Sequence, residues 1–154
     1  MKTICLNMIV KNESKVIERM LESIIGIINF FVIVDTGSTD NTIEIIQQFF
    51  KKYNISGFVM KSKFIDFEFN RNEALQLCYK LSKSDYILLL DADMVLKINK
   101  FDKSNLDKDM YDMTQTDNNY SYKNSRLIKN NNIFVYKGLT HEVLLSKQNV
   151  TSET

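Results

Sequence analysis

The chain has 154 residues, of which 44% are hydrophobic and 25% charged, and its formal net charge is +1. This length predicts one domain spanning residues 1–154, and the composition is typical of a globular protein. A charge so close to neutral gives no electrostatic basis for binding nucleic acid or an anionic membrane. No apolar run approaches the ~18–20 residues of an integral membrane helix, so we expect no membrane-spanning segment.

Cysteine usage and the start of the chain bear on location. Cys5 lies in an apolar stretch and Cys78 on a predicted helix, and two cysteines are too few for the disulfide framework of a secreted domain. The first apolar stretch begins within the opening residues, which leaves no room for a cleavable signal peptide. We therefore expect buried thiols and a cytoplasmic protein.

Up to residue 90, strands and helices are predicted to alternate. Apolar and β-branched runs predict strands over residues 3–10, 30–34, 57–61 and 86–90. Apolar residues at helical spacing predict helices between residues 14 and 25, 40 and 50, and 70 and 83. Alternation in units of about thirty residues is typical of βαβ units and a largely parallel sheet.

The remainder of the chain is more polar. Residues 97–119 show no strong periodicity, and the polar run over residues 114–119 predicts a loop. Residues 125–129 and 133–137 flank three asparagines, which predicts a hairpin. The predicted fold class is therefore α/β, with a mostly parallel central sheet, flanking helices and a C-terminal antiparallel hairpin.

Two aspartates follow the most apolar predicted strand. The run Tyr86-Ile87-Leu88-Leu89-Leu90 leads directly into Asp91-Ala92-Asp93, which is typical of a strand buried on both faces. If the chain stays extended, both carboxylates point to the same side. Two like charges ~4 Å apart repel by about 4 kcal/mol at a surface-like dielectric, a cost that a divalent cation, a shared proton or a nearby base removes. The alternative is a solvated turn, where aspartate is common.

Polar residues follow the other predicted strands as well. Asn12 and Glu13 follow the first strand, Asp35 the second and Ser62 the third. Because the carboxyl ends of parallel strands share one edge, these side chains and the two aspartates are expected to meet there. Mg²⁺ and Mn²⁺ prefer oxygen ligands and commonly bridge carboxylates to phosphates, so this edge predicts a metal-dependent nucleotide site. The alternative is that βα loops are simply polar.

Five segments carry a family resemblance. They are residues 9–13 (IVKNE), 34–42 (VDTGSTDNT), 66–67 with 71–75 (DF and RNEAL), 90–93 (LDAD), and 126–128 (RLI) followed by Gly138 and His141-Glu142. In this order they resemble the glycosyltransferases of family 2, which have the GT-A fold. The resemblance spans nearly the whole chain and implies a single nucleotide-sugar-binding and catalytic domain over residues 1–154.

The resemblance implies roles at a donor site. Asp35, with the loop Asn12-Glu13, would bind the base and ribose of a nucleotide-sugar donor, and Arg71-Asn72 would face the donor from the third helix. Asp91 would lie near the ribose and the metal, with Ala92 in the same donor-binding segment. From the residues alone, Arg71 and Asn72 could instead be the solvated start of a helix.

The resemblance also implies a metal centre and a base. Asp93 would ligate Mn²⁺ or Mg²⁺ directly, beside Asp91, and His141 would supply a further ligand. Through the metal, Asp93 would serve catalysis by neutralising the leaving diphosphate. Glu142 could take the proton of an acceptor hydroxyl, or it could orient His141 or pair with a lysine. Taken by itself, a single histidine is more often structural or exposed.

The activity implied is metal-dependent transfer of a sugar from a nucleoside diphosphate donor, UDP by default, to an unknown glycan, protein or lipid acceptor. Inversion at the anomeric carbon is the commoner outcome in the family. The chain ends soon after His141, so the acceptor-binding part is expected to be short or incomplete. A homodimer is left open.

Three alternatives also stay open. One is a non-catalytic nucleotide-sugar-binding module, or the donor half of a larger assembly. Another is a haloacid-dehalogenase-type phosphatase, whose nucleophile motif residues 88–95 resemble. The last is a nucleotidyltransferase, although the loop after the first strand is not the glycine-rich, basic loop that such enzymes use.

Overall fold

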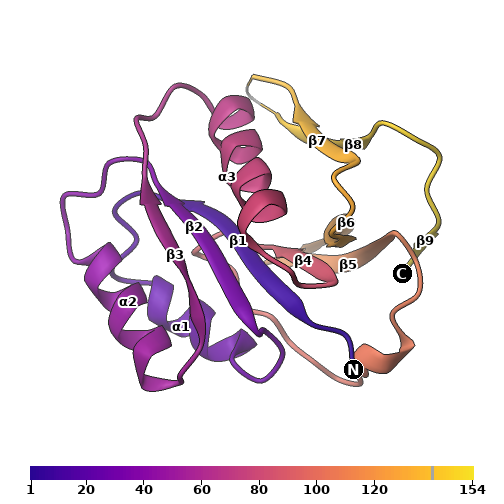
Figure 1. Cartoon of the computed structure of the whole chain (residues 1–154), viewed down its shortest axis with the longest axis horizontal. Helices are drawn as coiled ribbons and strands as arrows, with labels where there is room; N and C mark the ends of the chain where they lie inside the picture. Colours follow the sequence, from indigo (N-terminus) through magenta and orange to yellow (C-terminus); the bar gives the residue numbers. More distant parts are fainter. Residues whose placement is uncertain (140) are drawn as a thin grey trace.

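A seven-stranded sheet with helices on both of its faces forms the centre of the molecule (Figure 1). The computed structural model describes residues 1–139 and 141–154. Its strands are β1 (Ile4–Val10), β2 (Phe30–Asp35), β3 (Ser56–Lys61), β4 (Tyr86–Leu89), β5 (Met110–Asp117), β6 (Tyr120–Lys129), β7 (Phe134–Lys137), β8 (Val143–Ser146) and β9 (Ser152–Glu153). Its helices are α1 (Ile17–Ile24), α2 (Thr42–Lys52) and α3 (Phe67–Leu81), with a 3₁₀ turn at Lys103–Asn105. Within the two described ranges, no helix is both long and apolar enough to cross a membrane.

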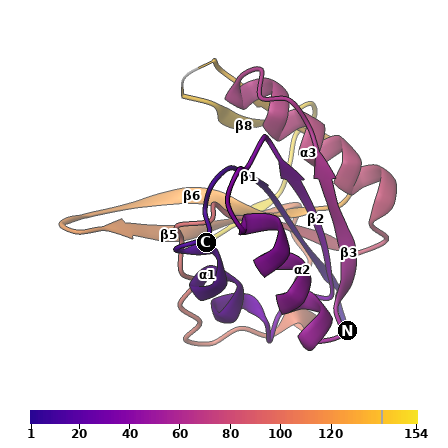
Figure 2. The same cartoon turned by 90° about the vertical axis from the view of Figure 1, so that its left-hand side faces the viewer.

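The strand order confirms the predicted fold class. The order is β3-β2-β1-β4-β6-β5-β9, and the first four strands of this order run parallel. β6 joins β4 antiparallel, and β7 and β8 form a separate antiparallel hairpin near the C-terminus. Figure 2 shows β5 and β6 extending as a long ribbon beyond the rest of the sheet. The parallel half of the sheet gathers the carboxyl ends of β1, β2 and β4 at one edge.

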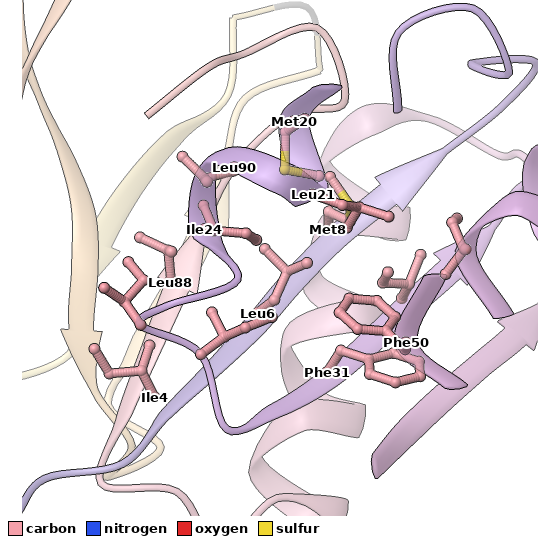
Figure 3. Close-up of a cluster of buried hydrophobic side chains, with 14 of the residues drawn as sticks. Ile4, Leu6, Met8, Met20, Leu21, Ile24, Phe31, Phe50, Leu88 and Leu90 are labelled. Atoms are coloured by element: carbon pink, nitrogen blue, oxygen red, sulfur yellow. The ribbon is translucent and has the colours of Figure 1, made fainter. Parts of the chain in front are cut away.

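Two clusters of buried apolar side chains, one on each face of the sheet, pack the sheet against its helices. Alternate side chains of β1 point to opposite faces, so Ile4, Leu6 and Met8 pack toward α1 and α2 in the larger cluster (Figure 3). Cys5 packs with α3 in the second cluster. Cys5 and Cys78 are both free and buried, as predicted, with their Sγ atoms 3.3 Å apart. Burial on both faces explains why the central strands are continuously apolar.

The second half of the chain differs from the predicted elements in two places. Residues 125–129 and 133–137 do not pair with each other, because the first lie in β6, which pairs with β4 and β5, and the second overlap β7, which pairs with β8. Pairing with the central strand β4 buries Leu127 and Ile128 completely, which a local hairpin would not do. The polar stretch over residues 97–119 contains β5, since Tyr111 and Met113 pack against the larger cluster. The expected loop over residues 114–119 is therefore mostly strand.

Gly57 in β3 is a position where the packing requires glycine. A Cβ atom there would collide with the backbone oxygen and the ring of Phe31 on β2. We expect Gly57→Ala to lower the free energy of unfolding by about 1–3 kcal/mol, the usual cost of overpacking. Gly26→Ala is the matched control, because nothing lies within 4 Å of a Cβ at Gly26, and its stability should be unchanged or raised by up to ~1 kcal/mol. Urea unfolding measures both variants, and equal stabilities would contradict the prediction.

Candidate active site

The loops that follow β1 and β2 are joined into one unit by hydrogen bonds. Asn12 adopts a left-handed backbone conformation (φ 55°), and its Oδ1 accepts a hydrogen bond of 2.7 Å from the backbone N–H of Thr39. The backbone N–H of Asn12 donates to Ser38 Oγ at 2.9 Å. The N–H of Glu13 donates to Thr42 Oγ1, at the start of α2, at 2.8 Å. These contacts fix the polar residues of both loops at the carboxyl edge of the sheet.

Asp35, the last residue of β2, is a buried carboxylate with an unused acceptor. It is 2% exposed, and its Oδ1 accepts from the backbone N–H groups of Gly37 and Ser38, each at 3.0 Å. Gly37 has φ +111°, a conformation that favours glycine. Asp35 Oδ2 is buried and has no hydrogen-bond partner within the described part of the chain. Because a buried polar group without a partner costs about 1–3 kcal/mol, this oxygen fits a ligand that donates an N–H.

A cleft of about 440 Å³ opens beside these loops. It is lined by Ile9, Val10, Lys11, Glu13, Thr36, Phe64, Phe67, Arg71, Asp91, Ala92 and Asp93. Of the residues predicted from the sequence, the structure brings Glu13, Arg71, Asp91, Ala92 and Asp93 together here. Asn12, Asp35, Asn72, His141 and Glu142 are not part of this lining. Asn12 nevertheless lies in the loop after β1, and Asp35 is the residue from which the loop after β2 begins.

Asp91 is tied to two arginines. Arg71 Nη2 lies 2.7 Å from Asp91 Oδ1, and Arg126 Nη1 lies 3.6 Å from Asp91 Oδ2. The chain turns here, as shown by the hydrogen bond of 3.1 Å from the N–H of Met94 to the carbonyl of Asp91. Residues 91–93 are therefore not extended, and the condition under which both carboxylates would point to the same side is not met. Both carboxylates still line the cleft. A divalent cation, a shared proton or a nearby basic group could relieve the repulsion between the two carboxylates. In the structure, two basic side chains, Arg71 and Arg126, pair with Asp91.

Arg71 links three elements through its guanidinium. Besides Asp91 after β4, its Nε donates to Glu142 Oε1, just before β8, at 2.6 Å. The guanidinium also lies 5.8 Å from the ring centre of Tyr136 in β7. Burial acts to lower the pKa of Arg71, but attraction to Asp91 and its other partners outweighs burial, and the pKa is raised. Arg71 is therefore a fixed positive charge between α3, β4 and the β7–β8 hairpin.

The acidic wall of the cleft fits a divalent cation bound together with phosphates. Burial raises the pKa of Glu13, and the neighbouring carboxylates of Asp93, Asp40 and Asp91 raise it further. Asp93 itself is exposed in the cleft. Mg²⁺ and Mn²⁺ are commonly held by one or two carboxylates plus substrate phosphate oxygens, which this arrangement satisfies. In residues 1–139 and 141–154, however, no three His, Cys, Asp or Glu side chains gather closely enough to hold a metal by themselves.

Two predicted residues lie apart from the cleft. The side chain of Asn72 donates to the carbonyl of Tyr136 at 2.9 Å and accepts from its N–H at 2.8 Å, so Asn72 joins α3 to β7. His141 is exposed, and the structure does not gather it with Asp91 and Asp93 into a metal-binding group. The roles of both residues toward a donor or a metal stay predictions.

The sequence reasoning gave no role to three residues that build the site. Arg126 supports Asp91, and it opens the RLI segment that contributed to the family resemblance. Phe64 and Phe67 line the cleft with their rings edge to face, 5.3 Å between centres. The signal that could have identified the two phenylalanines is the aromatic-rich stretch that runs from the end of β3 into the start of α3.

Part of the chain is similar in sequence to curated proteins. The chain is 34% identical over 90 residues to the poly-beta-1,6-N-acetyl-D-glucosamine synthase of Staphylococcus epidermidis, which covers 55% of this chain and 20% of that protein. It is 34% identical over 91 residues to the SPbeta prophage-derived glycosyltransferase SunS of Bacillus subtilis (strain 168). This match covers 59% of this chain and 20% of that protein. The chain thus spans about a fifth of the length of these curated relatives.

The fold and the family are both supported by these comparisons. The mannosyltransferase PcManGT of Pyrobaculum calidifontis superposes with a TM-score of 0.51 at 18% identity, covering 61% of this chain and 28% of that one, a likeness in fold. The sequence profile described as Glycosyl transferase family 2 matches residues 5–147. Because this match covers most of the chain, the chain belongs to glycosyl transferase family 2.

Proposed function

We propose that this chain carries the donor site of a metal-dependent glycosyltransferase, which moves a sugar from a nucleoside diphosphate to an acceptor hydroxyl. The observation that carries the proposal is the buried Oδ2 of Asp35, which has no hydrogen-bond partner among the described residues and lies at the border of an acidic cleft. The Staphylococcus epidermidis relative is named a poly-beta-1,6-N-acetyl-D-glucosamine synthase and the Bacillus subtilis relative a glycosyltransferase, and the structure of PcManGT is a complex with GDP-Man and Mn²⁺. These names support the proposed ligand class.

The base of the donor is the proposed partner of Asp35. A carboxylate oxygen accepts a hydrogen bond, so it favours a base that presents an N–H, as uracil does at N3 and guanine does at N1. UDP stays the default nucleotide, and GDP is the second choice on the same chemistry. Phe64 and Phe67 add apolar surface to the cleft for the base or ribose.

The metal is proposed to bind at Asp93. Asp93 is exposed in the cleft, whereas Asp91 is paired with two arginines, so Asp93 is the carboxylate that we expect to hold Mn²⁺ or Mg²⁺ with the diphosphate oxygens. A bound ion would supply neutralisation of the negative charge on the departing diphosphate. In the transfer, the acceptor oxygen bonds to the anomeric carbon, and the bond from that carbon to the diphosphate oxygen breaks. The diphosphate keeps the electron pair of the broken bond. The proton of the acceptor hydroxyl passes to solvent.

Glu142 is proposed to position Arg71. Its Oε1 lies 2.6 Å from Arg71 Nε, so this carboxylate oxygen already accepts a hydrogen bond from the guanidinium. This contact favours positioning over the proton transfer that the family resemblance suggested. The pairing of Asp91 with two arginines likewise disfavours the phosphatase alternative, which would use Asp91 as a nucleophile.

Calorimetry with Mn²⁺ and a panel of nucleoside diphosphates tests the proposal directly. Binding of UDP or GDP that requires the metal supports it, and failure of the intact chain to bind any member of the panel would end it. Release of nucleoside diphosphate from a donor sugar then separates an enzyme from the alternative, a non-catalytic nucleotide-sugar-binding module. An inverted product, read by NMR, tests the predicted stereochemistry.

Asp93→Asn should abolish metal-dependent binding of the nucleoside diphosphate while leaving the fold intact. The substitution removes a carboxylate that is exposed in the cleft and open to a cation, so we expect the affinity in Mn²⁺ to fall to its value in EDTA. Asp117→Asn, an exposed aspartate at the tip of the β5–β6 hairpin, is the matched control and should bind like the wild type. Unchanged affinity in Asp93→Asn would show that Asp93 is not a ligand.

A further inference from the structure

The strand β3 leaves one edge of the central sheet open. It comes first in the strand order, and within the described part of the chain it pairs with β2 alone (Figure 1). The N–H of Ser62, just after β3, donates to the carbonyl of Asp35 on β2 at 2.8 Å. Backbone groups alternate in direction along a strand, so Gly57, Val59 and Lys61 turn their N–H and C=O groups away from β2. Such an open row of donors and acceptors can pair with a further strand.

Apolar side chains lie exposed along the same edge. Phe58 and Met60 are 45% and 40% exposed. The ring of Phe58 meets that of Phe30 edge to face, 5.8 Å between centres, which places Phe58 and Met60 on the α3 face of the sheet. Edge strands are commonly protected by a proline, a bulge or an inward-pointing charge. The chain has no proline, β2 and β3 pair without a shift in register, and the one charged residue of β3, Lys61, is its last.

The edge of β3 is complementary to a second copy of itself. An antiparallel copy related by a two-fold axis at Val59 pairs all the outward-turned residues, Val59 with Val59 and Gly57 with Lys61 of the second copy. Phe58 then lies directly opposite Met60 of the second copy, in a close pair where sulfur and ring can touch. Lys61 lies opposite a glycine, so no like charges face each other within the strand pair.

The helix beside this edge carries complementary charges. α2 contacts β3, and it has Glu44 in its first turn and Lys51 and Lys52 in its last, all exposed. The same two-fold axis would place the two α2 helices antiparallel, with the acidic start of one toward the basic end of the other. A two-fold contact is also closed, so it covers the open edge of both copies and does not extend into a fibre.

We propose that β3 is a dimer interface, at which a second copy of this chain pairs antiparallel and continues the sheet. The strand register, the pairing of Phe58 with Met60 and the charges of α2 all match this edge to itself. β3 has six residues, whereas standard interfaces use ~20–30 residues a side, so we expect a reversible dimer rather than an obligate one. The proposal is independent of the proposed function, because no residue of β3 lines the donor cleft.

Sedimentation velocity of the full chain over a range of concentrations, without nucleotide, tests the interface. We expect a monomer–dimer equilibrium. Met60→Glu should raise its dissociation constant at least about tenfold, because pairing would bury the new carboxylate against the ring of Phe58. Met60 is 40% exposed, so the variant should keep its fold, which urea unfolding checks. Tyr120→Glu is the matched control, since Tyr120 is 78% exposed on β6, beyond β4 in the strand order, and this variant should dimerise like the wild type.

Three results of this experiment would overturn the proposal. One is a wild-type chain that stays monomeric up to about 1 mM, where a dimer would be worth no more than ~4 kcal/mol. Another is a folded Met60→Glu protein that dimerises as well as the wild type. The last is a dimer that Tyr120→Glu weakens instead, which would place the contact on the β5–β6 ribbon.

Cysteine cross-linking tests the register by a separate route. Val59→Cys places two thiols across the axis, where the Cα atoms of a hydrogen-bonded pair lie ~5.5 Å apart, within the range of a disulfide. Met60→Cys is the matched control, because its two copies would be diagonal neighbours ~7–8 Å apart, too far for a disulfide. Cys5 and Cys78 are buried, so oxidised glutathione should cross-link Val59→Cys into a dimer and leave Met60→Cys largely uncrosslinked. Equal yields of cross-linked dimer would overturn the proposed pairing.

Discussion

Asp35→Asn should weaken nucleoside diphosphate binding about 100-fold or more while leaving the domain at least as stable. The asparagine Oδ1 can still accept from Gly37 and Ser38, which places its NH₂ group where Asp35 Oδ2 has no partner. The NH₂ group of the asparagine would then face the N–H of the base, so two hydrogen-bond donors would meet. A hydrogen bond to a charged group is worth ~1.5–3 kcal/mol and an unsatisfied buried donor costs ~1–3 kcal/mol. Together these give ~2.5–6 kcal/mol, and a 100-fold change in affinity corresponds to ~2.8 kcal/mol.

The free energy of unfolding of Asp35→Asn is a second measurement, and it should not fall as the nucleotide affinity does. In the free protein a buried, unpaired carboxylate oxygen is replaced by a neutral amide, so the free energy of unfolding should stay equal or rise. Asp40→Asn is the matched control, because Asp40 lies in the same loop but is exposed, and hydrogen bonds with Thr42 and Ser14 lower its pKa to about 2. It should bind nucleotide nearly as well as the wild type. A stable Asp35→Asn protein with wild-type affinity would remove Asp35 from the donor site.

The half of the site that the sequence predicted depends on one geometric rule. Parallel strands end at a common edge, so residues that directly follow β1, β2 and β4 could be brought together without knowing any side-chain contact. Glu13 and Asp93 were placed in the cleft in this way. The same rule applies to Asp35, whose burial at the end of β2 follows from its position at the end of an apolar strand.

The half that was missed depends on contacts distant in sequence. Arg126 reaches Asp91 because β6 pairs antiparallel with β4, and this pairing competes with a local hairpin that three asparagines made plausible. The choice is decided by burial of Leu127 and Ile128 against the central strand, a tertiary effect that a local pattern does not contain. The strand β5 was missed for the same reason, since its inward residues are few and its outward ones polar.

Arg71→Met should lower the free energy of unfolding by about 2–4 kcal/mol. Methionine keeps the apolar stem but removes the guanidinium, which leaves Glu142 without this partner at 15% exposure and Asp91, 27% exposed, with Arg126 at 3.6 Å. Breaking a buried ion pair from one side costs ~3–5 kcal/mol, and the partial exposure of this site reduces that figure. Urea unfolding at pH 7 measures the loss.

A double-mutant cycle with Glu142→Gln shows whether Arg71 acts through the hairpin. If the Arg71–Glu142 contact holds the β7–β8 hairpin to α3, the two substitutions together should destabilise by clearly less than the sum of their separate effects. Arg19→Ala is the matched control, since Arg19 is an exposed arginine whose Nη2 makes a long 3.4 Å contact with the carbonyl of Asp93, and its effect should stay within ~0.5 kcal/mol. If the losses of unfolding free energy in the two single variants simply add, Arg71 stabilises the protein through Asp91 and not through Glu142. A loss in Arg71→Met no larger than in Arg19→Ala would mean that the contacts of the Arg71 guanidinium contribute nothing to the free energy of unfolding.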